Sequence, residues 1–222
     1  MRGLYAICDV DFLKLRGVEP LAFVEAVLEA RPAALQLRAK SLGGRATLAL
    51  LQAVQARCVP LGVPAFANDR PDLALLAECS GVHLGQSDLS LADARRFAPG
   101  LRVGVSTHDL AQVTQALAGR PDYLAFGPIF STSTKSDAEP VVGLAGLAEA
   151  ARLCREAGVP LVAIGGISLA QAHAVAEHAD AAAVISALLP GSGLGAVSSA
   201  AAQLQSVLAG QPRGVTGDAN VR

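Results

Sequence analysis

Three cationic side chains lie at the ends of short sequence segments, two after an apolar segment and one after a segment rich in Ser and Thr. Arg38 and Lys40 close an apolar run, and Lys135 closes a hydroxyl-rich segment, Thr132-Ser133-Thr134-Lys135. A guanidinium group binds two phosphate oxygens at once, whereas an ammonium group supplies a compact point charge. Cations placed in this way suit a diphosphate group, because they stabilise the negative charge that develops on it as it leaves.

Two acidic side chains follow two further apolar runs. Asp69 comes after the run that ends at Ala67, and Asp88 comes shortly after the run that ends at Leu84. Mg²⁺ prefers oxygen ligands and typically takes one or two carboxylates together with phosphate oxygens and water. Both residues are therefore candidate Mg²⁺ ligands. The structural alternative is that each residue caps the helix expected after it or belongs to the turn before that helix. For Asp88, Ser90 is a competing N-cap.

A second set of residues suits another anion. Gly165-Gly166 precedes an expected helix, and Ile185-Ser186 ends another apolar run. Backbone N–H groups at such positions bind phosphate, and barrel enzymes often place a phosphate after their seventh and eighth strands. Two anion sites indicate two phosphorylated substrates, or one substrate with a phosphate at each end.

Other kinds of chemistry find little support. The sequence shows no readable Ser-His-Asp or Cys-His arrangement, and its four cysteines are far apart, as expected of buried thiols in a reducing cytoplasm. The formal net charge of −1 gives no basic excess for nucleic acid. The uncharged stretch 181–211 is interrupted by proline and glycine, so we expect no membrane span. We therefore expect a cytoplasmic enzyme. The sequence does not determine its oligomeric state, and a homo-oligomer is compatible with it.

The elements that must position these residues alternate along the whole chain. Apolar runs predict strands at 4–8, 34–38, 63–67, 81–84, 102–106, 123–126, 161–164 and 182–185. Helical patterns predict helices at 22–29, 45–57, 72–78, 91–97, 110–117, 146–156, 169–177 and 196–208.

Eight β-then-α units predict an α/β fold, a single-domain (β/α)₈ TIM barrel over residues 1–209. An open doubly wound sheet is the alternative, but no GxGxxG follows the first strand. The polar segment 210–222 is expected to be a disordered tail. Because the strands of such a barrel end at one rim, the polar residues above should meet there.

The motifs, read in order, resemble those of the thiamine-phosphate synthase family. They are LYAICD, QLRAK, ANDRPDLA, GVHLGQSDL, GVSTH, DYLAFGPIFSTSTK, VAIGGI and VISA, and the resemblance covers roughly residues 3–208. It implies a (β/α)₈ barrel that joins hydroxymethylpyrimidine diphosphate to hydroxyethylthiazole phosphate, with Mg²⁺. The implied reaction is dissociative: diphosphate leaves first, and the thiazole nitrogen then attacks the pyrimidine-methyl cation.

The resemblance also implies roles for individual residues. Those implied to bind the pyrimidine diphosphate are Gln36, Arg38, Lys40, Asn68, Ser106 and Lys135. Those implied to bind the thiazole phosphate are Thr132, Ser133, Thr134, Gly166, Ile185 and Ser186. Asp69 and Asp88 would hold Mg²⁺, and Arg38, Lys40, Ser106 and Lys135 would act in catalysis.

Some positions depart from the family pattern, and alternatives remain. Ala39 stands where a Glu is common, which alters the charge expected near the diphosphate. The nearest alternative is a thiazole tautomerase-like barrel enzyme that uses His108, which would not need the full set of cations and acids. Another phosphate-binding barrel enzyme, or a non-catalytic sensor of thiamine precursors, would not require the two acids together.

Overall fold

The computed structural model describes residues 1–132, 140–191 and 193–210, and its strands form one closed parallel barrel. Each strand pairs with the next, and β8 pairs with β1 to close the ring. The strands are β1 (Gly3–Asp9), β2 (Ala34–Arg38), β3 (Ala65–Asn68), β4 (Gly81–Leu84), β5 (Arg102–Thr107), β6 (Tyr123–Phe126), β7 (Leu161–Ile164) and β8 (Ala181–Val184). The predicted (β/α)₈ barrel is confirmed.

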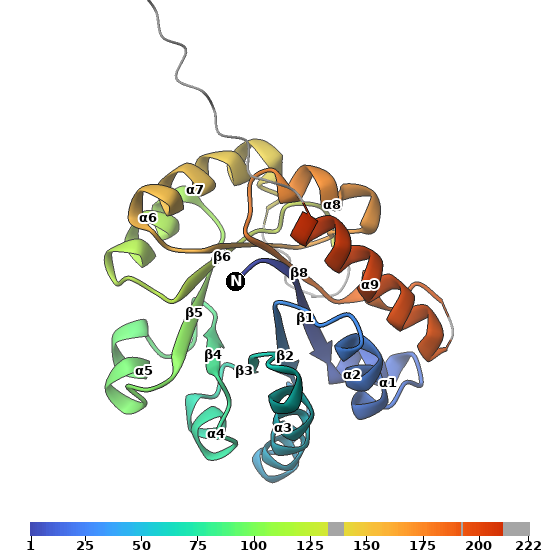
Figure 1. Ribbon diagram of the computed structural model, residues 1–222. Coiled ribbons are helices and arrows are strands. Elements are labelled where there is room, and N and C mark those ends of the chain that lie inside the picture. The colour runs from blue at the N-terminus through green and yellow to red at the C-terminus, as the bar shows by residue number, and fades with distance from the viewer. Residues whose placement is uncertain (133–139, 192, 211–222) are drawn as a thin grey trace, which may run out of the picture.

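Helices surround the strands as an outer ring (Figure 1). They are α1 (Val10–Leu15), α2 (Pro20–Leu28), α3 (Gly44–Cys58), α4 (Pro71–Leu76), α5 (Leu91–Phe97), α6 (Leu110–Ala118), α7 (Gly143–Ala157), α8 (Leu169–Ala176) and α9 (Leu194–Gly210), with short 3₁₀ turns η1 (Val59–Leu61) and η2 (Ser186–Leu188). None of the helices in these residues has both the length and the apolar composition of a membrane span.

Alternation along the strands divides the core into two parts. In β1, Leu4 and Ala6 belong to the large cluster shared with the helices, whereas Tyr5 and Ile7 belong to a small cluster inside the barrel. Successive side chains of a strand point to opposite faces of the sheet, so one register fixes which residues face inward. The inward residues near the ends of β2, β3 and β5 are the polar ones predicted for the site.

Two glycines make room for large side chains inside the barrel. A Cβ atom at Gly104 would lie 2.0 Å from Cζ of Tyr123, and one at Gly81 would lie 2.6 Å from a ring carbon of Phe66. Atoms at such distances would overlap, and a densely packed interior leaves little room for the rings to move away. The two glycines therefore let Tyr123 and Phe66 occupy the centre of the barrel, below its mouth.

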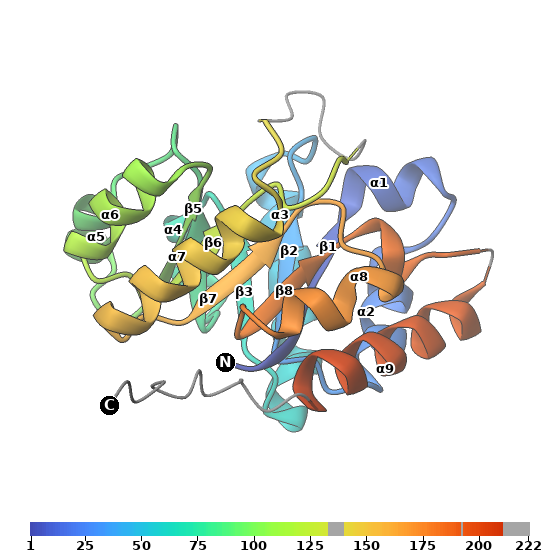
Figure 2. The ribbon, with the colours of Figure 1, turned by 90° about the horizontal axis from the view of Figure 1, so that it is seen from above.

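The helix α1 was not predicted. Asp9 caps it by accepting a hydrogen bond from the backbone N–H of Phe12 at 3.0 Å. Figure 2 shows β1 running from the N-terminus toward α1, which places α1 at the end of the barrel where the strands finish. Strand β3 begins at Ala65 and not at Val63, because the N–H of Val63 bonds to the carbonyl oxygen of Cys58. Beyond Gly210, the last residue of α9, the predicted tail lies outside the described residues.

Candidate active site

A pocket of about 410 Å³ is lined by inward-facing residues of the strands and by the segments that follow them. Eight of the predicted site residues line it: Gln36, Arg38, Lys40, Asn68, Asp69, Asp88, Ser106 and Ile185. The strands that carry them are parallel neighbours, so their ends meet at one rim. The structure therefore brings these eight residues together at one pocket.

Arg38 forms an ion pair with a residue that sequence reasoning missed. Its Nη1 lies 2.6 Å from Oδ2 of Asp9, whose side chain is only 2 % exposed, while that of Arg38 is 18 % exposed. The pairing follows from register, because Asp9 and Arg38 are Cα partners in the β1–β2 ladder. Asp9 thus holds one terminal nitrogen of the guanidinium group, and the Arg38 side chain also lines the pocket. An aspartate at the end of the first apolar run was the available signal.

Lys40 pairs with Asp69 at the same rim. Lys40 Nζ lies 2.6 Å from Asp69 Oδ2, and the lysine side chain is 54 % exposed. Asp69 has a left-handed backbone, with φ of 63°, and its N–H donates to the carbonyl oxygen of His83 at 2.8 Å. Such a conformation is uncommon for a residue other than glycine and gathers at functional sites. The capping alternative fails here, because the N-cap of α4 is Arg70.

Asp88 lies close to Asp69 and Lys40 and lines the same pocket. Burial, followed by the neighbouring carboxyl group of Asp69, raises the pKa of Asp88 above its ordinary value. Its Oδ2 accepts a hydrogen bond from the N–H of Gly85 at 2.7 Å, which turns the loop after β4. The capping alternative fails for Asp88 too, because Ser90 caps α5 through the N–H of Asp93 at 3.1 Å.

These two carboxylates fit a hard cation. Two adjacent carboxyl groups with cationic side chains beside them are a donor set that Mg²⁺ can take when phosphate oxygens and water complete its coordination. Over the described part of the chain, no three His, Cys, Asp or Glu side chains gather into a metal-binding group. A site made by protein ligands alone is therefore not found there, and two carboxylates plus a diphosphate match the chemistry.

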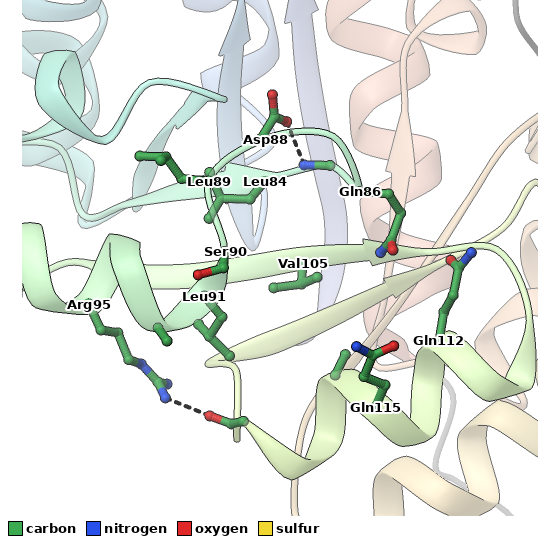
Figure 3. A pocket seen from close by; sticks show the side chains of 14 residues that line it. Leu84, Gln86, Asp88, Leu89, Ser90, Leu91, Arg95, Val105, Gln112 and Gln115 are labelled. Carbon is green, nitrogen blue, oxygen red and sulfur yellow. Dashed lines mark hydrogen bonds between the residues drawn. The ribbon is translucent and has the colours of Figure 1, made fainter.

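The loop after β4 also forms one wall of a second pocket, of about 570 Å³, between α5 and α6. Figure 3 shows Asp88 bonded to the loop backbone, with Leu91 and Val105 among the apolar lining residues. Gly85, Gln86 and Asp88 line both pockets. The loop that carries one candidate Mg²⁺ ligand is thus thin, with a pocket on either side of it.

A chain of buried hydrogen bonds crosses the interior beneath the rim. Gln36 Nε2 donates to the Tyr5 hydroxyl at 3.0 Å, and that hydroxyl lies 2.7 Å from the hydroxyl of Tyr123. The Tyr123 hydroxyl lies 2.9 Å from Nδ1 of His83, and Nε2 of His83 lies 2.8 Å from Oγ of Ser106. Tyr5, His83 and Tyr123 were not predicted, since single aromatic residues in apolar strands are more often core.

His108 also lines the pocket, and it does not cap the next helix. Its Nδ1 lies 2.7 Å from the carbonyl oxygen of Gly127, and Asp109 is the N-cap of α6. The ring is thereby fixed against the start of the segment that follows β6. Among the described residues, the hydrogen bonds of His108 go to the Gln112 side chain and the Gly127 carbonyl oxygen, and neither partner is an acid or a base.

The second anion site is described only in part. The N–H of Phe130 bonds to the carbonyl oxygen of Gly165 at 3.0 Å, so the segment that leads to Thr132 lies beside the two glycines. Gly165 and Gly166 have φ of 99° and 64°, values that favour glycine, and a Cβ on Gly166 would lie 2.4 Å from the carbonyl oxygen of Ser131. Ser186 is exposed and begins η2. Ser133, Thr134 and Lys135 lie outside the described residues.

The chain is similar in sequence and in structure to proteins of one known family. The sequence matches the family described as thiamine monophosphate synthase over residues 4–188. A thiamine-phosphate synthase of Chloroflexus aurantiacus is 37 % identical over 207 residues, covering 92 % of each chain. One from Methanoculleus marisnigri is 41 % identical over 177 residues, covering 79 % of this chain and 81 % of the relative. A solved thiamine phosphate pyrophosphorylase from Pyrococcus furiosus superimposes with a TM-score of 0.79 at 30 % identity, over 92 % and 94 % of the two chains.

Proposed function

The chain belongs to the thiamine monophosphate synthase family, whose members are transferases, and from this premise we propose its reaction. The enzyme joins hydroxymethylpyrimidine diphosphate to hydroxyethylthiazole phosphate and releases thiamine phosphate and diphosphate. The observation that carries the proposal is the meeting of Arg38, Lys40, Asp69 and Asp88 at one rim of the pocket. Two cations beside two acids match a diphosphate that leaves with a divalent cation.

The chemistry requires little from the protein except charge. The bond between the pyrimidine methylene carbon and the diphosphate oxygen breaks, and both electrons leave with the diphosphate. The lone pair of the thiazole nitrogen then forms the new carbon–nitrogen bond, and no proton is transferred. Preplaced cations lower the barrier because they stabilise charge that is present in the transition state and not in the substrate. Arg38, Lys40 and Lys135 have this role.

Asp69 and Asp88 would hold Mg²⁺ with the diphosphate oxygens completing its coordination. When bound there, the ion would supply positive charge that stabilises the departing diphosphate. Lys40, already 2.6 Å from Asp69, is placed to contact both the carboxylate and the diphosphate. Asp9 keeps Arg38 extended toward the same group, through its 2.6 Å ion pair.

The two rings would lie on either side of the breaking bond. Gln36, Asn68 and Ser106 line the pocket and would bind the pyrimidine. Thr132, Ser133, Thr134, Gly166, Ile185 and Ser186 would bind the thiazole phosphate. The support for this second site is the contact between the segment before Thr132 and the glycines after β7.

The test is turnover of both substrates by the purified protein in the presence of Mg²⁺. Formation of thiamine phosphate supports the proposal, and its absence with well-folded protein refutes it. A His108→Gln variant separates the tautomerase alternative, because the synthase reaction needs no base there and should continue. Lys135→Ala should lower kcat by ~10²–10³-fold, as loss of a donor aimed at developing charge does.

A further inference from the structure

The buried hydrogen-bond chain has five members, and the proposed chemistry uses only the two at its ends. All five residues line the pocket, and the nearly buried Tyr5, Tyr123 and His83 connect Gln36 to Ser106 through the barrel interior. The two tyrosines are each 1 % exposed and His83 is 8 % exposed. A run of polar groups through an apolar core is costly unless every group is paired, so it needs a reason.

The packing holds these three rings in place. Tyr5 and Tyr123 meet edge to face with centroids 5.6 Å apart, and the His83 and Tyr123 rings stack with centroids also 5.6 Å apart. Gly104 leaves the space that Tyr123 fills, since a Cβ there would lie 2.4 Å from its hydroxyl oxygen. The rings cannot turn without displacing backbone, so the hydroxyl protons are the part of the chain that can rearrange.

The direction of the chain follows from one end. Gln36 donates through Nε2, so the Tyr5 hydroxyl accepts there and must donate its own proton onward to Tyr123. With this direction and a neutral His83 ring, Tyr123 would donate to Nδ1 of His83, and the ring proton would then be on Nε2 and directed to Ser106 Oγ. Ser106 Oγ accepts this hydrogen bond and has its own O–H left to donate into the pocket.

We propose that Tyr5, Tyr123 and His83 are positioning residues that fix the direction of this hydrogen-bond chain and thereby select the pyrimidine. The chain makes Gln36 present its Oε1 acceptor, beside its second N–H, and makes Ser106 present a donor. This inference rests on the proposed function for the pyrimidine diphosphate. A ring with an amino group beside a ring nitrogen complements the fixed amide of Gln36.

An oxo-substituted ring reverses that pattern, because it carries a carbonyl oxygen beside a ring N–H. Binding it would require the Gln36 amide to turn over, so that Oε1 faces the Tyr5 hydroxyl. Tyr5 would then have to donate backward, and every proton as far as Ser106 would have to reverse with it. The selectivity therefore depends on the hydroxyl and ring protons of Tyr5, Tyr123 and His83 as well as on Gln36 and Ser106.

The first experiment reads the direction without substrate. ¹⁵N NMR of histidine-labelled protein distinguishes the two neutral tautomers, and a His83→Asn variant assigns the His83 signals among the four histidines of the chain. The expected result is a proton on Nε2 and none on Nδ1. The opposite tautomer overturns the proposal. This result does not depend on turnover, so it stands or fails separately from the proposed function.

The second experiment measures selection. Binding of the amino-substituted and the oxo-substituted pyrimidine diphosphates is compared by calorimetry, without the thiazole substrate, in wild type, Tyr5→Phe and Tyr123→Phe. We expect the affinity ratio to fall about 10-fold or more in both variants, as when a buried hydrogen-bond partner is lost. The control is Thr107→Val, which removes a buried hydroxyl that bonds to the Ala125 carbonyl oxygen at 2.9 Å, outside the chain.

The affinity ratios in the tyrosine variants and in the control decide whether the proposal holds. A ratio that falls in the two tyrosine variants and not in Thr107→Val supports the proposal. An unchanged ratio in folded tyrosine variants overturns it, as does an equal fall in the control. If neither tyrosine variant folds, the tautomer of His83 in the wild type decides. Selective binding with no product formed would contradict the proposed function and leave this inference standing.

Discussion

The buried ion pair between Asp9 and Arg38 allows a quantitative prediction. Asp9 is 2 % exposed, and its two oxygens have separate partners. Oδ1 accepts the N–H of Phe12 at 3.0 Å, and Oδ2 lies 2.6 Å from Nη1 of Arg38. Asp9→Asn keeps an oxygen for the Phe12 N–H and removes the charge, whereas Asp9→Ala removes both interactions. The two variants therefore separate the contribution of the helix cap from that of the ion pair.

The magnitudes can be worked from this geometry. Removing one partner of a buried pair typically costs ~3–5 kcal/mol. Because the Arg38 side chain remains 18 % exposed and reaches the pocket, water recovers part of that loss. We expect Asp9→Asn to lower the free energy of unfolding by about 2–3 kcal/mol. Asp9→Ala should cost ~1 kcal/mol more, which is the usual value of an N-cap.

The assay is urea unfolding followed by circular dichroism, with thermal unfolding as a second measure. For a chain of this size, a loss of ~1 kcal/mol lowers Tm by about 2–4 °C, so Asp9→Asn should unfold roughly 4–12 °C below wild type. The control is Asp72→Asn, which breaks the exposed pair with Arg70 and should cost less than ~1 kcal/mol. An Asp9→Asn protein as stable as the control would refute the reasoning. In active protein, the same variant should also raise KM for the diphosphate substrate, because Arg38 is released.

Three further predictions concern the barrel interior, the proposed metal ligands and the thiols. Gly104→Ala should lower the free energy of unfolding by ~1–3 kcal/mol, measured by urea unfolding, because its Cβ would lie 2.0 Å from Tyr123; a neutral result would contradict the close contact. Asp88→Asn should raise the Tm of the metal-free protein slightly, because it removes like-charge repulsion with Asp69, and should raise the Mg²⁺ concentration that turnover requires, because one of two proposed ligands is lost; an unchanged metal titration would contradict the ligand role. Burial raises the pKa of the Cys58 thiol to about 11 and that of Cys79 to about 12. The folded state therefore keeps protons that the unfolded state releases above pH ~8.5, so the urea midpoint should fall between pH 8 and 10, and a constant midpoint would contradict this.

The barrel itself was predictable because its signal is local and repeated. Four strands, including the one at 81–84, have the predicted bounds, and the others differ by one or two residues at their ends. Each strand is recognised from its own run of apolar residues, and each helix is recognised from the helical spacing of its own apolar residues. The rule that parallel strands finish at one rim then brought Arg38, Lys40, Asp69 and Asp88 together without any tertiary information.

The residues that were missed share a physical cause. Asp9 ends an apolar run and could have been solvated, and only the β1–β2 register pairs it with Arg38. The helix α1 is short, and its cap is the same Asp9. His83 and Tyr123 sit in strands whose apolar neighbours predict ordinary core. Their hydrogen bonds connect residues 40 positions apart in the sequence, and no local pattern reports such a contact.

The sequence by itself determined the order of the eight units, the residues that end each strand, and the kind of chemistry that those residues could perform. Only the tertiary structure decided which charges pair and which polar groups touch inside the barrel. Composition and periodicity depend on each segment's own exposure to water, so they can be read from neighbouring residues. Partner choice depends on the register and curvature of the closed sheet. The register of the sheet places Asp9 beside Arg38, and the absence of a side chain at Gly104 leaves space for Tyr123 inside the barrel.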